Sequence, residues 1–92
     1  MNRTESIRAA QSLANDWGIR DEQCVETLAT DETFAAYAYL FQQAQLYSGL
    51  LEAEGALEEM RGDAHDAVHS LRLVSKARAC ELLGVDDLYE AE

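Results

Sequence analysis

The sequence predicts an all-α protein, a small bundle of about four helices built on a long antiparallel helical hairpin. The 92 residues include no proline and only five glycines, whereas Ala, Leu, Glu and Gln are abundant, and this composition favours helices over strands. Apolar residues recur at helical spacing through most of the chain. Because so short a chain can enclose only one core, we expect residues 1–92 to form a single helical domain with a short acidic C-terminal tail.

The first two predicted helices are short and amphipathic. Asn2 and Glu5 match a capping box, and the apolar residues that follow predict a helix over residues 4–17. Asp21 is a suitable N-cap for a second helix over residues 22–29. Helices of this length can each cover only part of a longer neighbour.

The third predicted helix is the longest and runs over residues 32–60. Arg61 would provide a basic last turn, and Gly62 a residue that easily leaves helical geometry. Asp63 would then cap a fourth helix over residues 63–83. The two long helices are therefore expected to form a hairpin that turns at Gly62.

The third helix carries apolar residues on two nearly opposite faces. The first face consists of Tyr37, Leu40, Phe41, Ala44, Tyr47, Ser48 and Leu51, and the other of Leu46, Leu50, Ala53, Leu57 and Met60. The fourth helix can cover one face and the short helices part of the other. We expect the remainder to bind a partner, either a second copy in a homodimer or a target protein. The alternative is a closed monomeric bundle in which the tyrosines are core residues.

The chain is strongly acidic, with 18 acids, seven bases and a formal net charge of -11. Such a surface repels phosphate groups and anionic lipids, so we expect neither direct nucleic-acid binding nor membrane binding. The apolar runs are also too short to span a bilayer. Cys24 and Cys80 lack the spacing of a zinc site, and no secretory signal precedes them. Reduced thiols in a soluble cytoplasmic protein are therefore expected.

The segment GDAHDAVHSL, residues 62–71, is the candidate metal site. Its two histidines are four residues apart, and Asp66-x-x-His69 resembles the Glu-x-x-His pair of ferritin-like bundles. A dimeric hairpin turning at Gly62 would bring acids of the third helix opposite these histidines. The candidate ligands are Glu58, Glu59, His65, Asp66 and His69.

We favour a simpler interpretation without metal or any other cofactor. His65, His69, Arg72 and Lys76 fall on one stripe of the fourth helix, and acids of the third helix would pair with this stripe in solvent. No catalytic motif is present either. There is no glycine-rich phosphate loop, and neighbouring acids such as Glu58 and Glu59 point in different directions on a helix. We therefore expect a protein that is not an enzyme.

The favoured function is binding to another protein. Arg61 is the only base between Arg20 and Arg72, so the middle of the chain is expected to present an acidic surface suited to a basic partner. If that partner binds nucleic acid, the acids would block its groove by imitating nucleic-acid charge. The candidate partner-binding residues are Glu52, Glu54, Glu58, Glu59, Tyr39, Leu46 and Leu50.

In size, charge and helicity, the chain resembles the small inhibitors that phages and plasmids use against host defence, including some anti-CRISPR proteins. The resemblance is one of general character and includes no shared motif. It implies a role as an inhibitor or adaptor.

Overall fold

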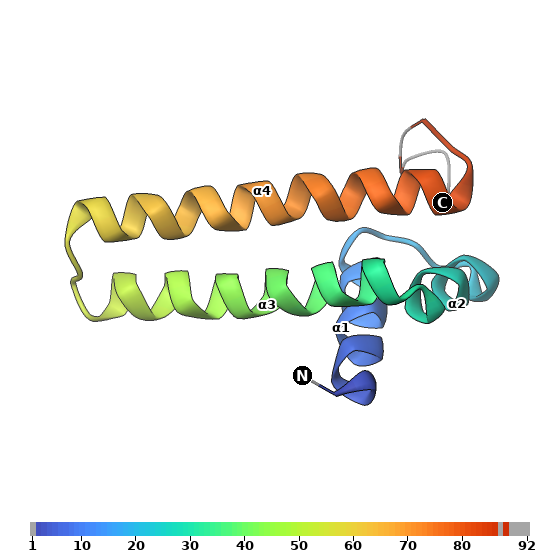
Figure 1. The fold of residues 1–92 in the computed structure, drawn as a ribbon, viewed down its shortest axis with the longest axis horizontal. Helices are drawn as coiled ribbons and strands as arrows, with labels where there is room; N and C mark the ends of the chain where they lie inside the picture. The colour runs from blue at the N-terminus through green and yellow to red at the C-terminus, as the bar shows by residue number, and fades with distance from the viewer. Residues whose placement is uncertain (1, 87, 89–92) are drawn as a thin grey trace.

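The computed structural model describes residues 2–86 and 88, which form four helices and no strand. The helices are α1 (Arg3–Asp16), α2 (Glu22–Thr30), α3 (Glu32–Ala53) and α4 (Glu58–Leu83). α3 and α4 pack together as a long antiparallel hairpin, while α1 crosses α3 and α2 lies near the start of α3 (Figure 1). The predicted fold class is confirmed. Most of the predicted acidic tail, residues 87 and 89–92, lies outside the described residues.

Side-chain caps start the first three helices. The carboxamide oxygen of Asn2 accepts a hydrogen bond from the Glu5 backbone N–H at 2.8 Å. The carboxylates of Asp21 and Asp31 accept backbone N–H bonds in the first turns of α2 and α3 in the same way. Such caps satisfy N–H groups that have no partner within the helix. The predicted starts at Asn2 and Asp21 are confirmed, and the ends of α1 and α2 agree with prediction to within one residue.

The hairpin turns at Gly55, not at Gly62 as predicted. Gly62 lies inside α4, which already begins at Glu58. The predicted boundary between helices over residues 32–60 and 63–83 is therefore wrong, and Asp63 is not a helix cap. A glycine within an exposed helix costs only about 1 kcal/mol relative to alanine, so neighbouring contacts easily outweigh its tendency to end the helix.

Backbone hydrogen bonds close the turn. Gly55 has a φ of 67°, in the left-handed region that favours glycine. Its N–H donates to the Glu52 carbonyl at 3.2 Å, and the Ala56 N–H donates to the Leu51 carbonyl at 2.9 Å, which satisfies two carbonyls at the end of α3. The Arg61 Nε then donates to the Ala56 carbonyl at 3.1 Å. Arg61 therefore stabilises the turn from the first turns of α4, not from the end of α3 as predicted.

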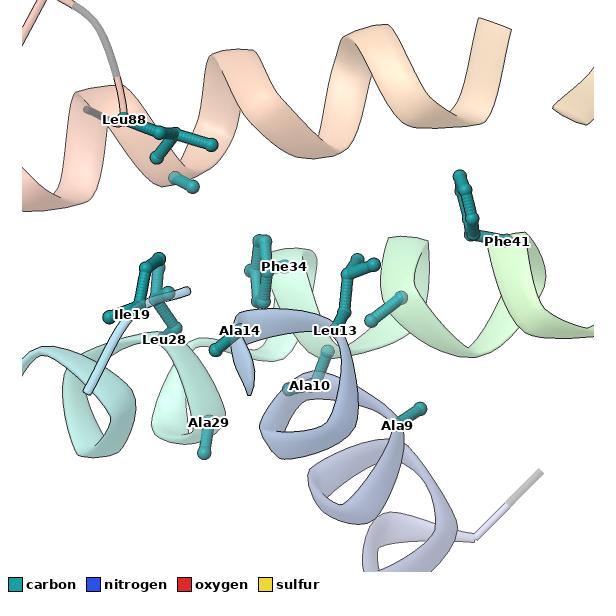
Figure 2. Packing of buried hydrophobic residues seen from close by; sticks show 13 residues of the cluster. Ala9, Ala10, Leu13, Ala14, Ile19, Leu28, Ala29, Phe34, Phe41 and Leu88 are labelled. Atoms are coloured by element: carbon teal, nitrogen blue, oxygen red, sulfur yellow. The ribbon is translucent and has the colours of Figure 1, made fainter. Parts of the chain in front are cut away.

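The hydrophobic core lies at one end of the hairpin, where all four helices meet. Phe34 is fully buried, and its ring meets that of Trp17 edge-on with centroids 5.9 Å apart. Phe34 and Phe41 point from α3 toward α4 (Figure 2). The cluster consists of Ala9, Ala10, Leu13, Ala14, Ile19, Leu28, Ala29, Phe34, Ala35, Ala38, Phe41, Ala79 and Leu88. We call residues 2–41, 72–86 and 88 the base, and residues 42–71 the arm.

An ion pair within the base joins the end of α4 to the start of α3. The Arg78 guanidinium donates to both carboxylate oxygens of Asp31, with N–O distances of 3.0 and 2.8 Å. These hydrogen bonds lower the pKa of the Asp31 carboxyl from its ordinary value, although partial burial acts in the opposite direction. Asp31 thus caps α3 and holds α4 at the same time.

Candidate protein-binding site

The arm leaves much of its apolar surface open to solvent. Of its residues, only Ser48, Leu51 and Ala64 are buried. Three leucines of the arm are each more than 60% exposed: Leu46, Leu50 and Leu57. Scattered exposed leucines are ordinary, but several large apolar residues on one short projection are a feature of interaction surfaces.

The end of the arm is acidic. Glu52 and Glu54 lie at the end of α3, Glu58 and Glu59 form the first turn of α4, and all four are exposed. We call these four residues the acidic tip. Glu58 and Glu59 also have a structural role, because negative charge stabilises a helix N-terminus. Leu57 lies between Glu54 and Glu58 in sequence and is the most exposed of the large apolar residues, at 73%.

Most of the predicted partner-binding residues come together on the arm. Leu46 and Leu50 are one helical turn apart on α3, and Glu54 follows one turn later at the acidic tip. Leu46 also lines a surface hollow with Gln42 and Gln45. The structure thus places apolar side chains directly beside the acids.

Tyr39 is separate from this group. It is half-buried, packs against the core cluster, and lines a hollow between α1 and α3 with Arg8 and Gln42. The sequence pattern could not place it, because the crossing point of α1 over α3 decides which residues of α3 remain open.

The predicted pairing of acids and bases along the hairpin is confirmed at one position. His65 Nε2 lies 2.8 Å from the Glu52 carboxylate across the two helices. Both side chains are more than half exposed, so the pair contributes at most about 1 kcal/mol. The prediction that Glu58 and Glu59 form further pairs of this kind from the third helix is wrong, because they belong to α4 itself.

Two basic side chains of the predicted stripe instead cover aromatic rings in the region that we call the base. The Arg72 guanidinium lies 5.7 Å from the centroid of Phe41, and the Lys76 ammonium lies 5.9 Å from that of Trp17. Cation–π contacts of this kind are favourable and shield the ring from water. Sequence reasoning missed them because the partners are far apart in the chain.

The candidate metal ligands do not converge. Glu58 and Glu59 precede His65 on the same helix, so the prediction that they face it from the third helix is wrong. The earlier turn at Gly55 is the reason. Within the described residues, no group of three or more His, Cys, Asp or Glu side chains is arranged to hold a metal ion.

The cysteines lie in structural surroundings. Cys24 and Cys80 are both half-buried and pack against the core cluster. Burial raises the pKa of the Cys24 thiol, and the neighbouring Asp21 carboxylate raises it further. Since the thiolate is the nucleophilic form, these surroundings make Cys24 less reactive.

The fold and this surface together define the class of protein: a small all-α bundle whose helical hairpin extends beyond the core and ends in exposed acids. In the described part of the chain, none of the helices combines the length and apolar character needed to cross a membrane. Comparisons with protein-family models, curated proteins and solved structures gave no match. The function is therefore inferred from the residues of this chain.

Proposed function

We propose that this chain is a non-enzymatic protein-binding module, an inhibitor or adaptor that binds a basic partner through the arm. One observation supports the proposal above all: the acidic tip lies beside the exposed side chains of Leu46, Leu50 and Leu57. In protein interfaces, apolar anchors provide most of the affinity, while charges accelerate association and select the partner.

The surroundings of the acidic tip favour a basic partner. Arg61 is the nearest base in sequence, and its Nε already donates to a carbonyl in the turn. Within the described part of the chain, Glu52 is the only one of the four acids that has a basic partner, His65. The remaining carboxylates are therefore available to lysine or arginine side chains of another protein.

A protein that binds nucleic acid through a basic groove is the partner we favour, because carboxylates at the tip would compete with phosphates for the same bases. An anti-defence inhibitor of the kind made by phages and plasmids is the particular role proposed. The cytoplasmic location and the homodimer expected from the sequence stay predictions.

The proposal is tested by affinity capture and mass spectrometry with two matched variants. In the test variant, Glu54, Glu58 and Glu59 are replaced by glutamine. In the control, Glu5, Glu22 and Glu26, three exposed acids of the base, are replaced in the same way. Both variants carry the same net charge, so they separate a local effect of the tip from the overall charge of the protein.

We expect the unmodified chain to retain a basic protein from a lysate of the source organism at about 50 mM salt and to lose most of it at about 300 mM, because salt screens exposed charges. The tip variant should bind the identified protein about tenfold more weakly, and the control about as well as the unmodified chain. Capture that is insensitive to salt, or equal weakening by both variants, would count against the proposal.

A further inference from the structure

Both helices of the hairpin carry apolar or small residues at coiled-coil spacing, alternating steps of three and four. The residues are Tyr37, Leu40, Ala44, Tyr47 and Leu51 on α3, and Met60, Ala64, Ala67, Leu71 and Val74 on α4. We call this set the heptad face; none of its members is charged, and the next steps along the two lines are charged residues at its ends, Glu54 and Arg78. Such spacing is typical of helices that pack along a continuous seam with a neighbouring helix.

The two lines of the heptad face lie on the same side of the hairpin. The contacts of His65 with Glu52 and of Arg72 with Phe41 mark one side. Since each residue advances about 100° around a helix, Val74 lies on the opposite flank of α4 from Arg72. By the same geometry, Leu40 and Tyr47 lie on the flank of α3 away from Glu52. The heptad face is therefore the side opposite the basic stripe.

The heptad face is only half covered. Leu51 and Ala64 are buried between the two helices. The outer members remain open: Leu40 is 48% exposed, Tyr47 53%, Met60 44% and Val74 41%. The buried members thus hold the two helices together, whereas the outer members are not fully covered by any residue that the structure describes.

We infer that a second copy of this chain covers the heptad face, so that two hairpins form a four-helix bundle. The open members of the face are few, so a symmetric pair would form a small interface, near the lower limit of about 1,000 Å² for specific association. A lone helix would cover only one of the two lines. The hairpin of a second copy presents two helices with the same length and spacing.

The distribution of charge also favours a second copy on this face. The chain carries a net charge of -11, yet the heptad face itself holds no acid from Tyr37 to Leu51 or from Met60 to Val74, with Glu54 following it at the tip and Asp63 beside it near the turn. Two copies can therefore meet there without burying like charges, and the repulsion between them acts over a longer range that salt screens. Since no member of the heptad face is negatively charged, a basic partner has better electrostatic complementarity with the acidic tip.

Sedimentation equilibrium of the full chain tests the inference. Between roughly 10 µM and 1 mM, we expect the apparent mass to rise from one chain toward two, as for an interface of this small area. The dimer should become stronger as salt increases, because salt screens the repulsion between acidic copies. Binding of a basic partner should become weaker under the same change. The inference does not rest on that partner, so the two proposals can fail separately.

Two variants on exposed positions of α3 locate the interface. Tyr47→Glu places a charge on the heptad face and should weaken the dimer at least about tenfold. Leu50→Glu, on a residue that is also exposed but lies outside the face, should change it by less than about twofold. Tyr47→Phe should leave the dimer intact. Circular dichroism should show unchanged helix content in all three variants, since neither position is in the core.

Two results would overturn the inference. The first is a monomer at every concentration and salt level. The second is a dimer lost in Leu50→Glu and kept in Tyr47→Glu, which would place the contact on the flank of Leu46 and Leu50.

Discussion

The base and the arm share the two long helices, α3 and α4, but use their apolar residues differently. In the base, Phe34, Leu28 and Ile19 are enclosed by contributions from several elements. In the arm, leucines of comparable size, such as Leu46 and Leu50, are mostly exposed. The base therefore encloses the core of the fold, whereas most apolar residues of the arm are not part of that core.

The lengths of the helices explain this division. α1 and α2 have 14 and 9 residues, whereas α3 and α4 have 22 and 26. The short helices can cover only one end of a hairpin made from the long ones, and Figure 1 shows the other end extending beyond α1. Two packed helices have no enclosed interior, so a large share of their apolar surface stays open.

The largest difference between the two regions is expected at Phe34 and Leu50. Phe34→Ala should lower the free energy of unfolding by about 3–5 kcal/mol, because it removes a fully buried ring and leaves a cavity. Leu50→Ala should change it by less than about 0.5 kcal/mol. Urea unfolding followed by circular dichroism measures both. Similar losses would show that the arm contributes to the core as much as the base.

A smaller effect is expected at Asp31, where two contacts of the base can be separated. Asp31→Ala should cost about 1–3 kcal/mol, because it removes both the helix cap and the partner of Arg78. Asp31→Asn should cost less, since asparagine still accepts the Phe34 N–H. Thermal unfolding at neutral pH compares the two variants, and equal losses would mean that the cap contributes nothing.

The same position predicts a dependence on pH. Because folding lowers the pKa of Asp31 below its ordinary value of 3.8, its ion pair stabilises the fold fully above that value. The stabilisation is lost as pH falls through the lower pKa of the folded state. Unfolding measured between about pH 2 and 5 should therefore depend less on pH in Asp31→Asn than in the unmodified chain. An unchanged slope would contradict this assignment.

The smallest effects are expected at Gly55, where the hairpin turns, and at Gly62, where the sequence predicted the turn. Gly55→Ala should destabilise the fold by about 1 kcal/mol, because a side chain is strained at positive φ. Gly62→Ala should stabilise it by about 0.5–1 kcal/mol, since Gly62 is helical and a Cβ there would have no atom within 4 Å. Thermal unfolding of this pair compares both positions directly, and the opposite signs would place the turn at Gly62.

The caps and the fold class could be predicted because they depend on local chemistry. Asn2 and Asp21 each accept bonds from residues two or three positions later, so a short stretch of sequence determines them. The turn could not be placed in the same way. Gly55 and Gly62 are both plausible helix ends, and contacts between α3 and α4 decide which one is used.

The candidate site was predicted only where it depends on one helix. The exposed apolar residues of α3 and the neighbouring acids follow from helical periodicity, although the position of Tyr39 depends on α1. The pair between Asp31 and Arg78 joins residues 47 positions apart, and no local signal in the sequence indicates it. Knowledge of the tertiary arrangement is needed for both.

The one-sided packing of the arm affects how firmly its two helices are held. Backbone hydrogen bonds near Gly55 can break in small local openings while the base remains folded, so amide protons there should exchange faster than those around Phe34. A partner that contacts both helices would suppress such openings, and its binding would then cost conformational entropy. If the arm binds the proposed partner, the packing of Leu51 and Ala64 between the two helices would thus influence affinity, although both side chains are buried.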